Sequence, residues 1–316
     1  MKKTLKIIGI VLIIAAVITG SAIIGNKILK PTNNGELQTE THTAETVSNT
    51  DNIINPKDIE WNGKDFETVN NDGLINILLI GQDKRDGETR QRSDAMILCS
   101  FNPETNKLAM ISFLRDLYVQ IPGYDDNRLN AAYAFGGFEL LKDTFEMNFG
   151  ITVDGCLESD FEGFEKIIDT AGGVEIDLTA SEADIIGGGA TEGICTLNGN
   201  QALTYARIRK TDSDFQRTAR QRNILNAVFE KAKTYSITEL AAFFSEILPL
   251  MSTDMTDDEL MTVALTFASS FQDIETESHI VPAEGTYKNA TIREMAVLLP
   301  DLYEIKKLIF EEYLPL

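Results

Sequence analysis

Arginine is concentrated in two short windows of this acidic chain. Eleven arginines occur in 316 residues, and ten of them lie between positions 85 and 128 or between positions 207 and 222. The whole chain carries a formal net charge of −21, so the clustering runs against its composition. The guanidinium group presents a planar fork of donors that matches the oxygens of phosphates and carboxylates. The two windows therefore predict one anion-binding site at the place where they fold together.

Carboxylates beside the first window add the chemistry of a metal site. The apolar run 74–80 is followed by Asp83 and Arg85, and Arg92 and Asp94 stand directly before or at the start of the next apolar run. Ligands of α/β sheets gather at the carboxyl ends of strands. If the intervening loop folds back over that edge, Asp83 and Asp94 can share one cation, and two carboxylates with phosphate oxygens suit Mg²⁺. A solvated loop of mixed charge is the alternative for these residues taken alone.

Two more basic positions stand at expected element ends. Arg115 and Asp116 follow a third apolar run, where a surface ion pair is the plain alternative. Arg128 opens a helical pattern, and the backbone N–H groups and dipole of a helix N-terminus attract anions. Both positions fit an anion site at the edge of a sheet.

The second arginine window contributes most of the basic groups. Arg207 and Arg209 alternate along a segment that we expect to be extended, so they face the same side. Asp214 is the expected N-cap of the next helix, on which Arg217 and Gln221 continue an apolar stripe at helical spacing. Polar groups on a core-facing stripe cost free energy unless a polar or charged partner meets them. A bound anion is one such partner, and solvent exposure at a frayed helix start is the alternative.

The elements that must position these residues alternate between strands and helices. Short apolar runs predict strands over 74–80, 95–101, 108–114, 151–156 and 174–178. Periodic patterns predict helices over 130–134, 138–149, 161–170, 201–207 and 214–233. The triple glycine at 187–189 has no helix after it, so it predicts a turn rather than a nucleotide fingerprint. This alternation predicts a layered α-β-α domain of the α/β class with a central mixed sheet.

The N-terminal part of the chain predicts a membrane anchor and a tether. In residues 1–30, Lys2, Lys3 and Lys6 precede a mostly apolar run that is long enough to span a bilayer, which takes about 20 residues. A cleaved signal peptide is the competing interpretation. The basic residues predict that the N-terminus stays on the cytoplasmic side of the cell membrane and that the rest of the chain lies outside the cell. Residues 31–70 are polar and predict a flexible extracytoplasmic linker.

The remaining chain divides into two parts. Residues 71–235 carry all the motifs above and form the predicted catalytic domain. Residues 236–316 predict a mostly helical extension that packs on that domain. Its expected elements are helices over 238–248, 257–269 and 292–312 and a short strand over 279–282.

Composition excludes several classes of function. The acidity argues against nucleic acid as a partner, because such proteins carry a basic face. The two histidines, His42 and His279, are too few for most Ser-His or Cys-His triads and for His-rich metal sites. Cys156 and Cys195 either form a disulfide outside the cell or remain free thiols, and the sequence leaves that choice open.

Six sequence blocks carry a more specific signal. In order they read IGQDKRDGETRQRSDAMIL, SFLRDLYVQIPG, RLNAAYAFGG, TAGGVEIDL, LNGNQALTYARIR and SDFQRTARQR. Together they resemble the LytR-CpsA-Psr family over residues 74–233, and the N-terminal anchor is part of the likeness. Leu114 replaces a usual proline, Gln216 a common glycine and Arg128 a usual lysine.

The resemblance implies a membrane-anchored, Mg²⁺-dependent phosphotransferase. Such enzymes move a glycopolymer phosphate (wall teichoic acid, capsule or a related polymer) from an undecaprenyl pyrophosphate carrier to a peptidoglycan hydroxyl. It implies Asp83 and Asp94 as metal ligands. It implies a catalytic set of Arg92, Asp94, Arg115, Arg207, Arg209 and Asp214. It implies pyrophosphate contacts from Arg85, Arg92, Arg115, Arg128, Arg207, Arg209, Arg217, Arg220 and Gln221.

Some questions stay open at this level. Asp94, Asp116 and Asp214 are all candidates for the general base. A lipid carrier needs an apolar tunnel, and we expect the sheet and the helical segments 130–149 and 224–229 to line it. A non-catalytic binder or regulator of wall assembly, and a pyrophosphatase that releases phosphate to water, are the alternative functions.

Overall fold

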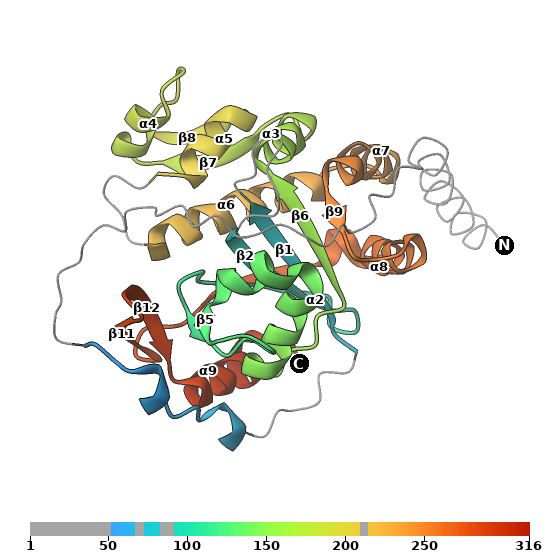
Figure 1. The fold of residues 1–316 in the computed structure, drawn as a ribbon. Coiled ribbons are helices and arrows are strands. Elements are labelled where there is room, and N and C mark those ends of the chain that lie inside the picture. Colours follow the sequence, from blue (N-terminus) through green and yellow to red (C-terminus); the bar gives the residue numbers. More distant parts are fainter. Residues whose placement is uncertain (1–51, 67–72, 83–91, 209–213) are drawn as a thin grey trace.

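A six-stranded mixed sheet lies at the centre of the structure, a computed structural model that describes residues 52–66, 73–82, 92–208 and 214–316 (Figure 1). The strand order is β10-β3-β2-β1-β6-β9. β2 pairs antiparallel with both β1 and β3, whereas β6 is parallel to β1 and β10 is parallel to β3. The predicted α/β class with a central mixed sheet is confirmed. The strands are β1 Ile75–Gln82, β2 Ser93–Asn102, β3 Lys107–Phe113, β6 Gly155–Asp160, β9 Ser252–Thr253 and β10 Glu275–Val281.

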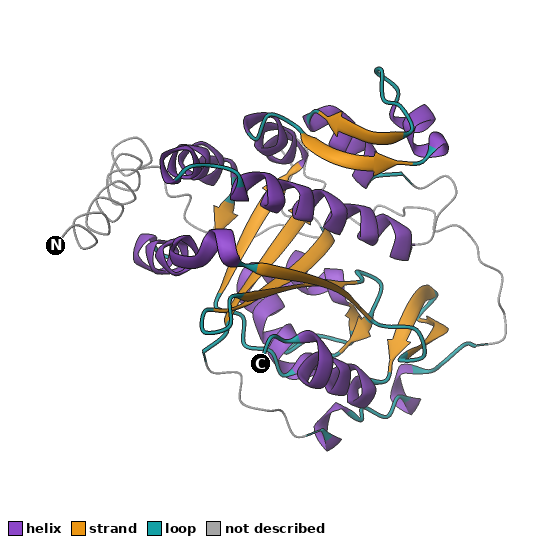
Figure 2. Cartoon of the chain, turned by 180° about the vertical axis from the view of Figure 1, so that it is seen from behind, coloured by secondary structure: helices purple, strands orange, loops and turns teal. Residues whose placement is uncertain are grey.

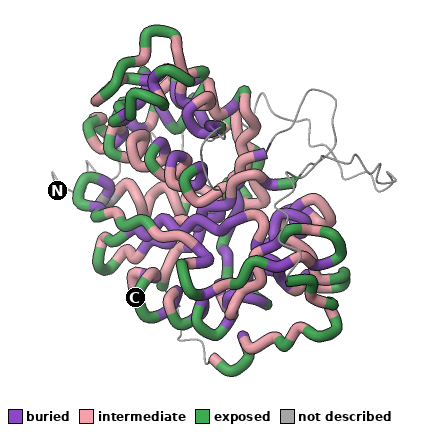
Figure 3. Tube along the Cα trace, turned by 90° about the vertical axis from the view of Figure 1, so that its left-hand side faces the viewer, coloured by how far each residue is buried: buried purple, intermediate pink, exposed green. Residues whose placement is uncertain are grey.

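The two faces of the sheet pack against different helices. Leu78 of β1 faces the side covered by α2 (Leu129–Phe149), where Phe145 and Phe149 are fully buried. Leu79, the next residue, faces the opposite side, where it packs with Phe229 of α6 (Asp214–Lys233). This alternation follows from the two-residue period of a strand. Figure 2 shows α6 crossing its face of the sheet, and Figure 3 shows the buried stretches concentrated between the layers.

Helix α2 joins two of the predicted helical segments through a kink. Gly137 has φ 69° and ψ −147°, a backbone conformation that favours glycine, and it separates the turns on either side. The helix ends at Gly150, whose positive φ closes it in a left-handed cap. The two predicted segments are therefore confirmed as one kinked helix.

A smaller layer packs on the far side of α6. It contains α3 (Phe161–Thr170), α4 (Ala180–Ile186), α5 (Gly199–Ala206) and the antiparallel hairpin β7 (Val174–Leu178) and β8 (Gly193–Leu197). The predicted bounds of α3, β7 and α6 agree with the structure. The glycines at 187–189 all have positive φ and form the predicted turn after α4. The expected strand over 151–156 is displaced, because residues 151–154 lie outside any strand and β6 begins at Gly155.

The C-terminal segment combines helices with strands. α7 (Ile237–Ile247) and α8 (Asp257–Ser270) confirm two predicted helices. The helix predicted over 292–312 is wrong in its first half. Arg293 and Glu294, both with positive φ, make the turn of a β-hairpin, and the helix starts only beyond it. The elements there are β11 Tyr287–Ile292, β12 Met295–Pro300, α9 Leu302–Leu308 and a π-helical turn η5 Ile309–Tyr313.

The segment expected to be an extension also completes the central sheet. It supplies β9 and the edge strand β10, which pairs with β3 over seven residue pairs. A small hairpin is formed by β4 Tyr118–Val119 and β5 Asn127–Arg128. The described residues also contain the 3₁₀ turns η1 Pro56–Asp58, η2 Gly63–Asp65, η3 Leu248–Leu250 and η4 Phe271–Asp273.

Two further expectations concern the termini and the cysteines. The expected anchor, residues 1–30, lies outside the described residues, and no helix among the described residues is long and apolar enough to cross a membrane. Cys156 and Cys195 are both free thiols, which settles the open choice against a disulfide. Burial raises the pKa of Cys156 to about 12, so this thiol stays protonated.

Candidate functional site

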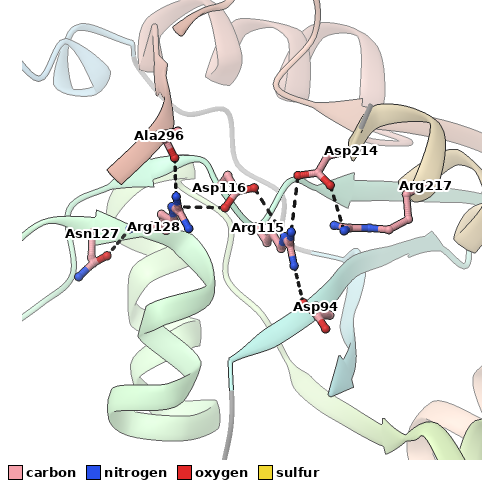
Figure 4. A network of polar contacts seen from close by, with 8 residues as sticks. All are labelled: Asp94, Arg115, Asp116, Asn127, Arg128, Asp214, Arg217 and Ala296. Carbon is pink, nitrogen blue, oxygen red and sulfur yellow. Dashed lines mark hydrogen bonds and ion pairs between the residues drawn. The ribbon is translucent and has the colours of Figure 1, made fainter. Parts of the chain in front are cut away.

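Several of the residues that the sequence singled out lie at one edge of the sheet. β1, β3, β6 and β10 run in the same direction and β2 runs against them, so the ends of the four and the start of β2 share that edge. Asp94 lies at the start of β2, and Arg115 and Asp116 follow β3. Arg128 closes β5, and Asp214 opens α6. These side chains form a continuous polar network (Figure 4).

The turn at Arg115 and Asp116 is held by backbone hydrogen bonds from three directions. The Leu114 amide donates to the Val281 carbonyl of β10 at 2.8 Å. The Asn130 amide at the start of α2 donates to the Arg115 carbonyl at 3.3 Å, and the Leu298 amide of β12 donates to the Asp116 carbonyl at 3.0 Å. The C-terminal segment therefore fixes the backbone on which the site is built.

Arg115 is the centre of the network. Its Nη1 donates to Asp94 Oδ1 at 2.7 Å, its Nε lies 3.5 Å from Asp116 Oδ2, and its Nη2 lies 3.9 Å from Asp214 Oδ2. Burial alone would lower the pKa of this guanidinium, but the three carboxylates outweigh it and raise the pKa. One side chain thus joins three elements through opposite charges.

Two more arginines extend the network at its ends. Arg128 Nε lies 3.3 Å from Asp116 Oδ1, and its Nη2 donates to the Ala296 carbonyl of β12 at 2.6 Å. Arg217 Nη1 lies 2.9 Å from Asp214 Oδ1, three residues earlier on α6, and only 5% of Arg217 is exposed. Arginine and aspartate therefore alternate along the network, which places several guanidinium forks around one small region.

Arg92 adds a further positive charge beside the network. Arg92 is exposed to solvent, but the protein atoms around its guanidinium partly desolvate it. This partial burial lowers the pKa of Arg92. Arg128 and Arg115 lower the pKa further by repulsion, and Asp116 opposes them. Guanidiniums close enough to repel one another favour an anion between them.

Asp116 differs from an ordinary surface carboxylate. Burial raises its pKa, and a hydrogen bond with Asp214 raises it further, while Arg115 and Arg128 act in the opposite direction. Asp116 therefore holds its proton more tightly than an isolated aspartate would, with Asp214 as its like-charged neighbour. Asp116 also lies between the guanidiniums of Arg115 and Arg128, so the site places a carboxyl group of raised pKa beside two fixed positive charges.

The predicted magnesium site is described only in part. Asp94 fits a ligand role, because Oδ1 binds Arg115 whereas Oδ2 makes no protein hydrogen bond among the described residues and the side chain is 29% exposed. Asp83, the other predicted ligand, lies outside the described residues. Within the described residues no group of three or more His, Cys, Asp and Glu side chains is placed to hold a metal ion. Mg²⁺ stays a prediction.

Arg207 lies apart from the network. It is the C-cap of α5 with φ −104° and ψ 3°, so the expected extended segment is wrong at this residue. Its guanidinium stacks over the ring of Phe161 at 4.4 Å, and Phe161 begins α3 directly after β6. Arg207 is exposed near the same sheet edge. Arg85 and Arg209 lie outside the described residues.

Arg220 lies on another face of α6 from Arg217. Its Nε donates to Glu182 Oε1 of α4 at 2.7 Å, and only 8% of the residue is exposed. The structure does not bring Arg220 into the network, and the predicted pyrophosphate contact is not supported by this position. Sequence reasoning missed Glu182. Its spacing to Thr179 is that of a capping box, which explains the helix start but not the contact with Arg220. Gln221 is half-buried on α6.

The expected lipid tunnel needs a correction. α2 and α6 lie on opposite faces of the sheet, so they cannot line one cavity. The α2 side is filled, with Leu141 and Phe145 fully buried. On the α6 side, Leu79 and Phe229 are only partly buried, so this face is less completely covered than the α2 side.

The fold and site thus define an α/β protein with an arginine–aspartate network at one edge of its mixed sheet. The chain belongs to the LytR_cpsA_psr family, whose sequence profile matches residues 34–307. This confirms the resemblance identified from the six sequence blocks.

Several relatives and solved structures are similar to this chain. The polyisoprenyl-teichoic acid–peptidoglycan teichoic acid transferase TagU of Oceanobacillus iheyensis is 38% identical over 211 residues, covering 64% of this chain and 65% of that protein. The regulatory protein MsrR of Staphylococcus aureus is 32% identical over 225 residues, covering 70% and 68%. A structure of TagT bound to LI-WTA has a TM-score of 0.63 at 26% identity, covering 77% and 91%. The crystal structure of B. subtilis TagT has a TM-score of 0.61 at 26% identity, covering 78% and 94%.

Proposed function

We propose that this protein is a membrane-anchored phosphotransferase that moves a glycopolymer phosphate from a polyprenyl pyrophosphate carrier to a peptidoglycan hydroxyl. The observation that carries the proposal is Arg115, whose one guanidinium contacts three carboxylates at the sheet edge beside Arg128 and Arg217. The similar TagU proteins are named teichoic acid transferases, and the similar TagT has been solved with LI-WTA. Both support a wall glycopolymer as the transferred group.

The proposed reaction balances as follows. The oxygen of an acceptor hydroxyl forms a bond to the phosphorus that carries the glycan. The bond from that phosphorus to the bridging pyrophosphate oxygen breaks, and prenyl phosphate leaves with the electron pair. The hydroxyl proton passes to a carboxylate of the protein. Phosphoryl transfer of this kind depends on positioning and on stabilising charge at the phosphate oxygens.

The arginines meet the electrostatic need of this step. Arg115 and Arg217 are both largely buried, so their charges act in a medium of lower dielectric constant than water. A pyrophosphate that enters would compete with Asp94, Asp116 and Asp214 for their donors. The carboxylates keep the guanidiniums in position until the anion arrives.

Asp116 is the proposed proton acceptor. Its raised pKa brings it closer to neutral pH than an ordinary aspartate, which improves a general base. Its neighbour Asp214 forms the ion pair with Arg217. Asp94, in contrast, is tied to Arg115 and is the better candidate for a metal ligand. When bound there, Mg²⁺ would neutralise charge on the phosphate oxygens.

The location of the reaction is also part of the proposal. Residues 1–30 would anchor the chain with its N-terminus inside, so that the described residues face the outer side of the membrane. The partly buried α6 face of the sheet would accept the first part of the prenyl chain.

One assay separates this proposal from its alternatives. Purified protein is incubated with a prenyl-pyrophosphate-linked glycan and Mg²⁺, with and without a peptidoglycan acceptor, and the products are identified by mass spectrometry. A phosphodiester-linked product that requires the acceptor supports transfer. Release of glycan phosphate without an acceptor supports a pyrophosphatase. Binding without turnover, in wild type and Arg115→Ala alike, supports a regulatory binder such as the name MsrR suggests.

A further inference from the structure

A cavity lies on the side of α6 away from the sheet. Its volume is about 340 Å³, within the range of roughly 300–1,000 Å³ for small-molecule sites. Its lining residues come from α4 and the residue before it, from the end of α5 and from the first three turns of α6. None of its lining residues belongs to the arginine–aspartate network.

The cavity carries no uncompensated charge among its described lining residues. The one acidic and the one basic side chain, Glu182 and Arg220, are paired at 2.7 Å. Glu182 Oε2 also accepts hydrogen bonds from the amide and hydroxyl of Thr179. The hydrogen bonds to Thr179 and Arg220 lower the pKa of Glu182, although burial acts against them. A phosphate or a metal ion therefore finds no open charge in this cavity.

The other lining groups are hydroxyls, amides and small apolar surfaces. Tyr205 is 2% exposed, and its hydroxyl accepts a hydrogen bond from Asn223 at 3.3 Å. The Tyr205 hydroxyl proton has no acceptor in the described residues. Ser181 is exposed at the cavity, and Ile185, 36% exposed, adds an apolar surface. Neutral donors and acceptors next to an apolar surface match the hydroxyl-rich edges and apolar faces of a sugar ring.

The position of the cavity links it to the proposed reaction. Gln216, Ala219 and Asn223 form a stripe at i, i+3 and i+7 on α6 that faces the cavity. Arg217, adjacent to Gln216, belongs to the network. The same first turns of α6 therefore contact both places. A glycan in the cavity would be held beside the phosphate site without using any of its charged groups.

We propose that this cavity is a carbohydrate subsite that holds one neutral sugar residue of a glycan substrate. The inference rests on the proposed transferase function. Two sources share the chemistry of the ligand, namely the peptidoglycan acceptor and the transferred glycopolymer. Tyr205 of α5 and Asn223 of α6 donate hydrogen bonds to the sugar, and Ile185 of α4 packs on its apolar face.

Three single substitutions test the subsite. Ser181→Trp places a large side chain in the cavity, and Tyr205→Phe removes one hydroxyl while keeping the buried ring. Asp184→Trp is the matched control, because Asp184 is exposed on the same helix but does not line the cavity. Circular dichroism and the thermal midpoint establish that each variant folds.

Binding is measured by calorimetry on the full chain in detergent. The probes are farnesyl pyrophosphate, muramidase-released peptidoglycan disaccharide and delipidated wall teichoic acid. We expect Ser181→Trp to weaken binding of one of the two glycans by at least about tenfold and Tyr205→Phe by about three- to tenfold, as expected for the loss of one hydrogen bond. Asp184→Trp is expected to bind like wild type, and all variants are expected to bind farnesyl pyrophosphate equally.

The outcomes distinguish this proposal from the function on which it rests. The glycan whose affinity falls identifies the source of the sugar. Unchanged affinity for both glycans in Ser181→Trp, equal losses in Asp184→Trp, or no saturable glycan binding by wild type would overturn the subsite. Failure of wild type to bind farnesyl pyrophosphate would instead count against the phosphotransferase.

Discussion

Arg217 and Arg220 stand one turn apart on α6, yet they belong to two different regions. Both are nearly inaccessible, with exposed fractions of 5% and 8%. Arg217 joins a network in which three arginines and three aspartates alternate at the sheet edge. Arg220 forms a pair with Glu182, which Thr179 also holds. A buried guanidinium therefore does not by itself indicate an anion site.

The difference between the regions lies in how charge is balanced. The carboxylate of Glu182 lies close to Arg220, and the pKa of Glu182 is lowered. The ion pair is therefore stable without a ligand. Around Arg115, one carboxyl has a raised pKa and a neighbouring arginine has a lowered one. Such opposing shifts are typical of sites that a ligand completes. Substitutions in the two regions should therefore affect activity and stability in different proportions.

The largest expected effect is on catalysis by Arg115→Ala. Removing this guanidinium takes away the group that contacts Asp94, Asp116 and Asp214 and would meet the phosphate. We expect the transfer rate to fall by about a hundredfold to a thousandfold, as for other groups that stabilise developing charge. The transfer assay measures it, with the thermal midpoint as control for folding. A variant that retains activity would contradict the role of the network.

Arg217→Ala tests the α6 end of the same network. The salt bridge to Asp214 is lost, and we expect at least about a tenfold fall in transfer, because the proposed charged contact to the substrate would be removed. Arg217→Lys is the matched variant, since it keeps the positive charge but lacks the planar set of guanidinium donors. Full activity in the lysine variant would show that only charge matters there.

Arg220→Ala is expected to act on stability instead. It leaves the carboxylate of Glu182 buried without its partner, and the free energy of unfolding should fall by about 3 kcal/mol. Urea denaturation measures this change. The double variant Glu182→Leu/Arg220→Met should recover much of the loss, and the affinity for farnesyl pyrophosphate should stay as in wild type. A large loss of that affinity would place Arg220 with the network.

Asp116 gives a smaller, pH-dependent effect on stability. Its pKa in the folded protein is raised above the ordinary 3.8, so the folded state holds the proton more tightly than the unfolded state. Its contribution to stability is therefore fully present below the ordinary pKa and is lost as pH rises through the raised one. Urea denaturation between pH 3.5 and 7, about the range of such titrations, should show this decline in wild type relative to Asp116→Asn. Parallel curves for the two proteins would contradict the raised pKa.

Arg207→Ala should have the smallest effect on stability. It is also the most direct test of the predicted catalytic set. The stacking of Arg207 on Phe161 is exposed, so unfolding should change by less than about 1 kcal/mol. The family resemblance nevertheless implies a loss of transfer. A stable and active Arg207→Ala protein would remove this residue from the catalytic set.

Local patterns predicted the elements better than their pairing. The strand over 174–178 and the helix over 161–170 agree with the structure, because a two-residue or 3.6-residue period and glycine breaks decide them locally. The helix over 292–312 failed. Its apolar residues fit either period, and the left-handed turn at Arg293 and Glu294 has no glycine to signal it.

By itself, the amino-acid sequence determined the class of the fold, the family and most of the candidate site residues. These depend on composition and on motifs that neighbouring residues carry. Only the tertiary structure decided that β10 pairs with β3, that α2 and α6 cover opposite faces, and that Arg217 and Arg220 serve different regions. Each of these depends on contacts between residues far apart in the chain. Glu182 lies 38 residues before Arg220, and no local pattern relates the two.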